Sequence, residues 1–392
     1  MTPAARLQAA IEIVDEVVMA AQVGGAAADT LIARYFKTRR YAGAKDRRAV
    51  RDLAYAAIRR AGERPASGRA AMIGLAQDRP DLAILFDGSR NGPEPIGDEP
   101  GASSGIAPAW LETKLAAVLG REELPALLER APLDLRVNRL KATREAVLAE
   151  LPEAEPGLLS PDALRLPEGT RIETLPPFLE GRVEVQDEGS QLIAAACDAA
   201  PGMTVVDLCA GAGGKTLALS AAMGAKGRLI ACDVDRPRLS RLAPRAERAG
   251  AASIETRLLD GGREAQRLAD LTAQADVVLI DAPCSGTGTW RRNPEGRWRL
   301  TSERLDRLKT MQAHVLEFGA PLVRPGGRLV YAVCSLLDEE GRERIEAFLA
   351  AHPGWASVDP VAVGRMHGPG RRLTPAHDRT DGFFIAALAR SC

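Results

Sequence analysis

The chain has 392 residues, of which 46% are hydrophobic, and its 52 basic residues balance 52 acidic ones. This composition excludes disordered and fibrous proteins, and the length exceeds that of one ordinary domain. Aromatic residues make up only 4%, so stacking of bases on exposed rings is not expected to be its main binding device.

Residues 1–86 are expected to form a helical domain. Apolar residues recur at the spacing of one helix face over 7–21, and a second such run covers 50–58. Between residues 34 and 69, twelve Lys and Arg stand against three Asp and Glu, a local net charge of +9. A nucleic-acid-binding surface is typical of this pattern, and a solvated helix face explains the charge equally well.

Two less regular segments follow. Residues 87–108 collect Gly, Pro, Ser and Asn with hardly any large apolar side chain, which predicts a linker. Residues 109–184 combine helical stretches with an alternating run at 133–138, which is typical of a strand. We therefore expect a small helical and α+β module over 109–184.

From residue 185 to 392, apolar runs alternate with helical segments. The runs lie at 204–208, 227–233, 277–281, 327–333 and 382–387. Strands separated by helices predict a doubly wound, mostly parallel sheet, in which ligands bind beyond the carboxyl ends of the strands. The expected fold class is α/β, a Rossmann-like sheet preceded by the small module and the helical domain.

The cysteines and the apolar runs also indicate the compartment in which the protein is expected to work. No apolar run reaches the roughly 18 residues of a membrane span, and the first residues do not resemble a signal peptide. The six cysteines form no Cys-x-x-Cys pair, and no neighbouring His completes a zinc site. We expect no membrane, no metal, and free thiols in a reducing cytoplasm.

A glycine loop, Asp207-Leu208-Cys209-Ala210-Gly211-Ala212-Gly213-Gly214-Lys215-Thr216, follows the first of these runs and opens a helix. A phosphate-cradling NTPase loop would need Gly where Cys209 stands, although the run 277–281 could serve as the magnesium-binding strand of an ATPase. A dinucleotide fingerprint would need Gly where Thr216 stands. S-adenosylmethionine asks only for a compact glycine turn and an acid for its ribose, and Asp233 and Asp260 follow the next strands.

Two cysteines come directly after apolar runs on the ligand side of the sheet: Cys284 in DAPCSG and Cys334 in VCS. Carbon 5 of a pyrimidine becomes nucleophilic when a thiolate adds to carbon 6, and cysteine is the side chain most available as an anion near neutral pH. Asp281 is placed to support the charge that develops at ring N3. A second ionisable group must then help to release the product, and these residues alone do not decide which thiol attacks.

The segment 290–299, which adjoins the thiol loop, is basic and contains two tryptophans. Forked hydrogen bonds from arginine to RNA phosphate are one interpretation, and a solvated loop is an equally good one.

Taken together, these motifs resemble the RsmB-like (Sun-family) RNA 5-methylcytosine methyltransferases over nearly the whole chain. The resemblance rests on the following segments: Leu135-Arg136-Val137-Asn138, Val185-Gln186-Asp187-Glu188-Gly189-Ser190-Gln191, the glycine loop, Asp233, Asp260, Asp281-Ala282-Pro283-Cys284-Ser285-Gly286, Arg291-Arg292-Asn293-Pro294 and Cys334-Ser335.

The resemblance implies a role for each candidate residue. Cys334 would attack carbon 6, Cys284 would assist product release, and Asp281 would lie at the catalytic centre. S-adenosylmethionine would be bound by Cys209, Ala210, Gly211, Ala212, Gly213, Gly214, Lys215, Asp233, Asp260 and Asp281. The N-terminal segment resembles part of a NusB-like RNA-binding domain, and RNA would be contacted by Arg39, Arg40, Lys45, Arg47, Arg48, Arg291 and Arg292.

Two departures from the family pattern stand at the site. The family's loop usually reads Cys-Ala-Ala-Pro-Gly-Gly-Lys, and here Gly211 and Ala212 replace the central Ala-Pro, which predicts a more flexible loop. Val333 stands where Thr is frequent, which removes a hydroxyl from beside Cys334.

The sequence therefore predicts a cytoplasmic, monomeric enzyme that methylates carbon 5 of cytosine in RNA, with small-subunit ribosomal RNA as the expected substrate. A P-loop ATPase acting on nucleic acid and an RNA-binding assembly factor with an inactive methyltransferase domain are the alternatives.

Overall fold

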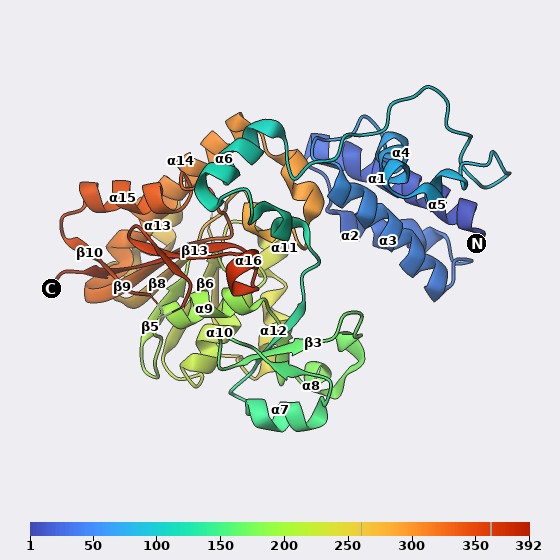
Figure 1. Ribbon diagram of the computed structural model, residues 1–392. Helices are drawn as coiled ribbons and strands as arrows, with labels where there is room; N and C mark the ends of the chain where they lie inside the picture. The colour runs from blue at the N-terminus through green and yellow to red at the C-terminus, as the bar shows by residue number, and fades with distance from the viewer. Residues whose placement is uncertain (260, 361–362) are drawn as a thin grey trace. The chain divides into compact units, whose positions relative to one another are not determined.

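The computed structural model describes residues 1–259, 261–360 and 363–392 (Figure 1). They form two compact units, one made of 1–130 with 289–302 and the other of 131–288 with 303–392. The short segment 289–302 thus belongs to the helical unit, whereas the domain division expected from the sequence assigned it to the methyltransferase part.

The first unit is helical, as the apolar spacing predicted. Its helices are α1 (Pro3–Val23), α2 (Ala28–Thr38), α3 (Ala44–Arg60), α4 (Gly68–Asp78), α5 (Pro80–Ala83), α6 (Ala109–Leu119) and the 3-10 turns η1 (Leu124–Leu128) and η5 (Pro294–Arg299). The Thr2 hydroxyl accepts a hydrogen bond from the Ala5 amide at the start of α1, and Gly24 ends that helix with φ +73°. The buried faces of α1, α2, α3 and α4 form one apolar core.

Segment 289–302 is fixed to these helices by buried polar side chains. Arg297, which is 0% exposed, donates to the carbonyl oxygens of Ile58 and Ala61 at the end of α3, at 2.6 and 2.8 Å. Glu295 accepts a hydrogen bond of 2.9 Å from the Ala28 amide at the start of α2. The segment therefore caps two helix ends and is an integral part of the helical unit.

The predicted linker 87–108 contains no helix or strand, yet it is bonded along the same unit. Its Gly105 amide donates to the Arg60 carbonyl oxygen at 3.0 Å, and its Ala102 amide donates to that of Ala70 at 2.8 Å. Ser104 also pairs with Ala61 in an isolated bridge. These backbone contacts make the segment an ordered strap on the helices.

The second unit begins with a small antiparallel sheet of order β2-β3-β1-β4. Its strands are β1 (Leu133–Val137), β2 (Glu155–Pro156), β3 (Ala163–Leu166) and β4 (Val183–Val185), and its helices are α7 (Arg144–Glu150), α8 (Pro176–Leu179) and the turn η2 (Ile172–Thr174). Leu135 and Val137 alternate into the apolar core of this module, so the run expected as a strand is one.

The main sheet has nine strands, with eight in the order β11-β12-β13-β9-β8-β5-β6-β7 and β10 paired to β13. Its strands are β5 (Thr204–Asp207), β6 (Arg228–Asp233), β7 (Glu255–Leu258), β8 (Ala275–Asp281), β9 (Val323–Val333), β10 (Trp355–Val358), β11 (Arg365–His367), β12 (Gly370–Leu373) and β13 (Phe383–Arg390). Strands β5 to β9 pair in parallel, and β13 runs antiparallel to β9. The predicted mostly parallel α/β fold is confirmed.

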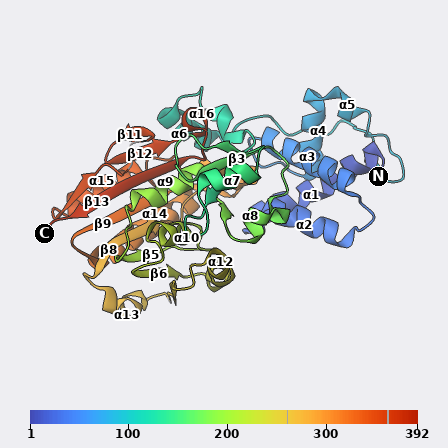
Figure 2. The same cartoon turned by 90° about the horizontal axis from the view of Figure 1, so that it is seen from below.

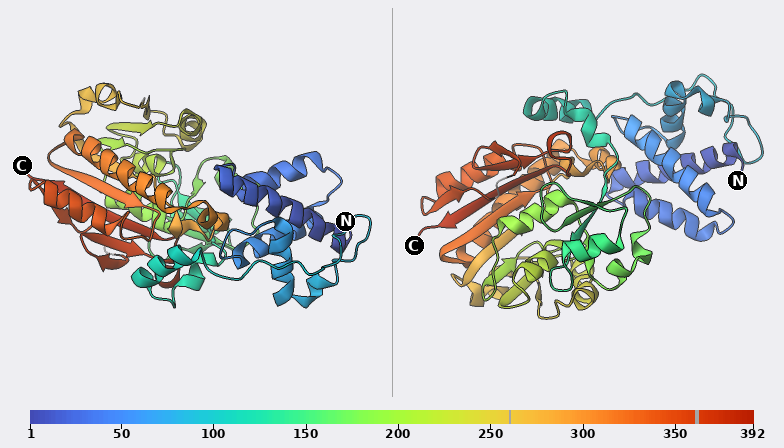
Figure 3. Two further views of the ribbon diagram at one scale, coloured as in Figure 1. Left: turned by 90° about the horizontal axis from the view of Figure 1, so that it is seen from above. Right: turned by 60° about the horizontal axis from the view of Figure 1, so that its bottom comes forward.

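Helices cover both faces of this sheet (Figures 2 and 3). Residues of α14 and α15 pack in the apolar core on one face, and residues of α9 and α10 pack in the core on the other. The helices of this part are α9 (Glu188–Ala196), α10 (Gly214–Ala222), α11 (Arg236–Leu239), α12 (Leu242–Ala249), α13 (Glu264–Arg267), α14 (Ser302–Gly319), α15 (Arg342–Ala351) and α16 (Pro375–Asp378), with the turns η3 (Ala269–Leu271), η4 (Thr287–Thr289) and η6 (Ala320–Leu322).

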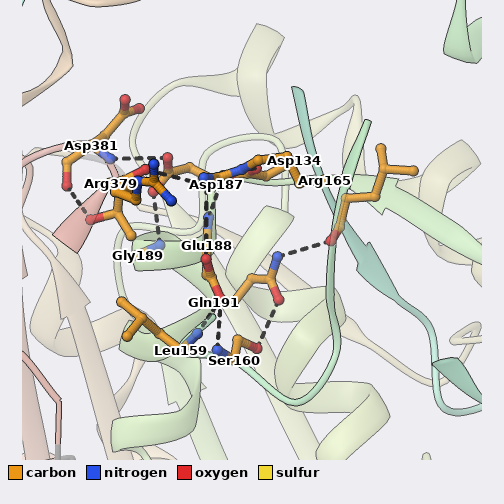
Figure 4. Close-up of polar contacts among 12 residues, drawn as sticks. Asp134, Leu159, Ser160, Arg165, Asp187, Glu188, Gly189, Gln191, Arg379 and Asp381 are labelled. Atoms are coloured by element: carbon orange, nitrogen blue, oxygen red, sulfur yellow. Dashed lines mark hydrogen bonds and ion pairs between the residues drawn. The ribbon is translucent and has the colours of Figure 1, made fainter. Parts of the chain in front are cut away.

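The motif at 185–191 ties the small module to the main sheet (Figure 4). Asp187 accepts from the Gly189 amide at 2.8 Å, which caps α9, and from the Asp381 amide before β13 at 3.0 Å. Glu188 accepts from the Ser160 amide of the module at 2.8 Å. Buried carboxylates satisfied in this way hold the module, α9 and the chain before β13 together.

Candidate active site

The two predicted thiols meet at one edge of the sheet. Cys284 follows β8 and Cys334 follows β9, and these neighbouring strands are parallel, with Asp281 opposite Ala332. Carboxyl ends of adjacent parallel strands lie side by side, so the sulfurs are 3.3 Å apart, and both cysteines are free thiols. The hydrogen bond with Cys334, together with burial and the negative charges of Cys334 and Glu340, raises the pKa of Cys284 well above its ordinary value.

Asp281, the last residue of β8, is paired with the lysine of the glycine loop. The Lys215 Nζ atom donates to Asp281 Oδ2 at 2.6 Å. Burial by itself lowers the pKa of Lys215, but the charge of Asp281 and this hydrogen bond outweigh it and raise the pKa, with help from Cys334. The ammonium group of Lys215 therefore offsets the charge of Asp281 and interacts electrostatically with Cys334.

The glycine loop uses left-handed backbone at two positions, with φ +54° at Gly211 and +84° at Gly213. The Gly211 amide donates to Asp233 Oδ2 at 2.7 Å, which joins the loop to the end of β6. The Ala212 carbonyl oxygen accepts from Arg245 Nη1 of α12 at 2.6 Å. The loop expected to be flexible is thus fixed on both sides, by an acid and by an arginine.

The room around the loop suits a ligand that approaches the backbone closely. A Cβ atom at Gly213 would lie 2.2 Å from the Leu242 side chain, whereas one at Gly214 would meet nothing within 4 Å. Gly213 is thus required for packing, and the open space lies at Gly214, at the start of α10, where a ligand has room to approach the helix N-terminus. This turn, with Asp233 at the end of the next strand, fits the nucleoside and amino-acid parts of S-adenosylmethionine. Asp260, the other acid predicted to bind the cofactor, lies outside the described residues.

A further acid, Asp207 at the end of β5, was not selected from the sequence. It is 1% exposed, accepts from the Thr216 hydroxyl at 2.7 Å, and its Oδ1 atom has no hydrogen-bond partner. Burial raises its pKa to about 7, while the Thr216 hydrogen bond acts in the opposite direction. Its place at the end of the strand before the glycine loop, which matches the place of Asp233 at the end of the next strand, is the sequence signal that could have identified it.

The remaining cysteines take no part in this geometry. Burial raises the pKa values of Cys197, Cys209 and Cys232, so these thiols stay protonated, and Cys392 is exposed near the end of the chain. The apolar setting of Cys209 means that only its backbone and its bulk can serve a cofactor.

The candidate RNA-binding residues differ in accessibility. On the helical unit, four of these side chains are exposed, namely Arg40, Lys45, Arg47 and Arg48. Arg39 is partly buried, and its guanidinium lies 3.6 Å from the centre of the Tyr35 ring. Arg292 is partly buried, and Arg291 is only 6% exposed, so little of its guanidinium can reach a phosphate.

Within 1–259, 261–360 and 363–392, no group of three or more His, Cys, Asp or Glu side chains is arranged to hold a metal ion. No helix in these ranges is long and apolar enough to cross a membrane.

Comparison with known proteins agrees with this geometry. The family described as 16S rRNA methyltransferase RsmB/F matches residues 194–389, and the ferredoxin-like domain of RsmF/B-like methyltransferases matches 107–173. A probable ribosomal RNA small subunit methyltransferase B of Synechocystis sp. is 35% identical over 302 residues, covering 72% of this chain and 67% of that protein. Ribosomal RNA small subunit methyltransferase B of Salmonella typhi is 36% identical over 292 residues, covering 73% and 66%.

The chain spans about two thirds of the length of these relatives. Among solved structures, the crystal structure of PH0851 superposes with a TM-score of 0.78 at 26% identity, covering 97% of this chain and 98% of that one. The sheet, the glycine turn and the acid at the end of β6 define an S-adenosylmethionine-dependent methyltransferase. The chain belongs to the 16S rRNA methyltransferase RsmB/F family. This membership sets the P-loop ATPase alternative aside.

Proposed function

We propose that the protein transfers a methyl group from S-adenosylmethionine to carbon 5 of cytosine in small-subunit ribosomal RNA, through a covalent bond between Cys334 and the base. The observation that carries the proposal is the 3.3 Å separation of the two sulfurs, beside the pair formed by Lys215 and Asp281. The names of the family and of its relatives support ribosomal RNA of the small subunit as the substrate.

The cofactor supplies an electrophilic methyl group on its sulfonium sulfur. Cys334 as thiolate adds to carbon 6 of the cytosine, which breaks the aromaticity of the ring and places electron density on carbon 5. That carbon then takes the methyl group. When the thiolate adds, ring nitrogen N3 takes up a proton from solvent, which neutralises the charge on the ring, and the Asp281 carboxylate accepts a hydrogen bond from the protonated nitrogen; that proton returns to solvent when the product forms. Lys215 holds the carboxylate in place.

Cys284 serves the release of the product. Before the reaction, the hydrogen bond with Cys334 helps to keep the proton on Cys284. Once Cys334 is bonded to carbon 6, its sulfur is uncharged, so the largest influence that raises the pKa of Cys284 disappears and its proton can pass to solvent. The Cys284 thiolate then removes the carbon-5 proton, the bond from Cys334 to carbon 6 breaks, and both thiols return to their starting states.

Covalent trapping tests these roles. The Cys284→Ala protein, given RNA and S-adenosylmethionine, should accumulate an RNA adduct that survives denaturing electrophoresis, whereas Cys334→Ala should form none. Cys392→Ser, which changes an exposed cysteine away from the site, should behave as the wild type. An adduct formed by Cys334→Ala would contradict the assignment.

The substrate is tested by mapping methylated cytosines in total RNA from cells with and without the gene. Loss of a single methylated cytosine in the small-subunit RNA supports the proposal, and an unchanged map contradicts it. Because Cys334→Ala removes only the chemistry, cells that carry it should lose the same cytosine methyl group. Ribosome assembly dependent on the protein but unaffected by that substitution would instead favour the assembly factor.

A further inference from the structure

A buried acid, Glu340, lies where the two cysteine turns meet. It is 0% exposed and follows Cys334 by six residues, in the loop between β9 and α15. Its Oε1 atom accepts from the Ser285 amide at 2.9 Å and from Gln312 Nε2 at 2.8 Å. Its Oε2 atom accepts from the hydroxyls of Ser335, at 2.5 Å, and of Ser285.

All four groups are donors, which is what an ionised carboxylate requires, since it can only accept. Two of them come from the serine directly after Cys284 and one from the serine directly after Cys334. The Ser285 and Ser335 hydroxyl oxygens are themselves 3.1 Å apart. The carboxylate therefore joins the two turns one residue beyond the sulfurs.

Burying a carboxylate is costly unless its charge is fully satisfied, and an amide or apolar side chain could fill the same space at lower cost. The backbone already brings the turns together through the Gly288 amide, which donates to the Cys334 carbonyl oxygen at 3.0 Å. A charge at this place thus needs a reason beyond holding the turns.

We propose that Glu340 is a positioning residue of the two-thiol centre: its carboxylate fixes the Cys284 and Cys334 turns against each other, and its negative charge favours the neutral thiol at Cys284. The role of Glu340 in catalysis rests on the proposed function, whereas its effect on the protonation of Cys284 does not. It gives different electrostatic surroundings to two cysteines that follow neighbouring strands.

The groups around Cys284 allow the charge of Glu340 to be felt there. From β9 and the loop after it come Cys334, Tyr331 and Glu340. On its own side stands Asp281, whose charge is offset by Lys215 of α10. Glu340 is thus a negative group near Cys284 with no basic side chain among its four donors, and its charge contributes to the raised pKa of Cys284.

The test measures the pH dependence of alkylation at each thiol in the cofactor-free protein, with iodoacetamide as the probe. Cleavage at Lys and Arg places Cys284 in peptide 268–291 and Cys334 in peptide 329–342, so mass spectrometry follows each thiol separately. Glu340→Gln keeps the shape of the side chain and removes its charge. In this variant the pH midpoint of Cys284 alkylation should fall by about one unit, which means that alkylation below the midpoint becomes about tenfold faster. Methyl transfer should lose at least about tenfold in kcat, with a smaller change in the KM for RNA.

The neighbouring acid provides a matched control. Glu339 pairs with Lys309 at 3.0 Å, and Glu339→Gln removes the same charge one residue away. It should leave the Cys284 midpoint unchanged. An unaltered midpoint in Glu340→Gln, or an equal shift in both variants, would refute the proposal, since a purely structural role changes the melting temperature of a variant without moving this midpoint.

Should Glu340→Gln not fold, Glu340→Asp keeps the charge and shortens the reach. Its Cys284 midpoint should stay within about 0.3 pH unit of the wild type while kcat falls. A lowered midpoint, or an unaltered kcat, overturns the proposal. The proposed function fails by a different observation, namely wild-type protein that does not methylate cytosine, whatever the thiols titrate to.

Discussion

Replacing Asp207 with Asn should remove the part of the pH dependence of stability of the second unit that comes from this buried acid. The carboxyl group is buried, its Oδ1 atom has no partner, and its pKa in the folded protein is about 7, against an ordinary value of 3.8. The difference of about three pH units corresponds to roughly 4 kcal/mol, at 1.36 kcal/mol per unit. Asn keeps the shape and an oxygen for the Thr216 hydroxyl, and it cannot ionise.

The sign follows from proton binding. Between pH 4 and 7 the folded protein holds a proton on Asp207 that the unfolded chain has lost. The contribution of this proton to the free energy of unfolding is therefore fully present below pH 3.8 and is lost as the pH rises through 7. Relative to Asp207→Asn, the wild type should therefore lose about 4 kcal/mol of unfolding free energy between pH 4 and pH 8. Urea unfolding of the cofactor-free proteins, followed by circular dichroism at pH 4, 5, 6, 7 and 8, measures the difference.

Asp276 provides a control of opposite sign. Although burial raises its pKa, hydrogen bonds from the Thr204 amide and from Arg324 lower it below the ordinary value. Asp276→Asn should therefore cost stability at neutral pH, and this cost should vanish as the pH falls below the ordinary range of aspartate. Parallel pH curves for the wild type and Asp207→Asn would refute the reasoning, because they would mean that Asp207 titrates alike in the folded and unfolded chains.

Three further substitutions test other contacts. Arg245→Met removes the donor to the Ala212 carbonyl oxygen and should weaken S-adenosylmethionine binding about tenfold in calorimetry. Arg248→Met removes the other arginine that pairs with Glu184 and should leave that affinity unchanged. Asp281→Asn should lower kcat for methyl transfer at least about a hundredfold, measured at saturating cofactor, because an amide neither carries the charge nor pairs with the lysine. Arg297→Met should destabilise the helical unit by about 3 kcal/mol, seen as a lower urea midpoint of its unfolding, because the carbonyl oxygens of Ile58, Arg59 and Pro294 lose the Arg297 donor, whereas that of Ala61 keeps the Trp298 indole.

Much of the catalytic part could be predicted because its signals are local. An apolar run followed by a polar residue marks the carboxyl end of a buried strand, and alternation with helices makes the strands parallel. Once Cys284 and Cys334 are placed at such ends, the topology brings them to the same edge of the sheet. The structure adds that β8 and β9 are direct neighbours, which the sequence order of the runs leaves open.

Other features depend on partners far away in the sequence. The segment after Cys284 is basic, a composition typical of an exposed surface, yet Arg297 is fully buried because carbonyl oxygens of the α3 end are its acceptors. Glu340 follows no strand end and stands beside another acid, Glu339, so nothing in the local pattern separates the fully buried acid from the partly buried one. Burial of charge is decided by tertiary partners, which one sequence does not reveal.

The charges around the sulfurs also explain how two neighbouring thiols can have different tasks. Cys334 directly follows β9, Cys284 lies a short turn beyond the end of β8, and each is followed by serine. Their charged neighbours differ, since Lys215 interacts with Cys334 while Glu340 acts on Cys284. The carboxylate of Glu340 disfavours a thiolate at Cys284, which suits Cys284 to carry a proton in the proposed reaction. On this reasoning, exchanging the charges around the sulfurs, and not moving the sulfurs, is what would exchange their roles.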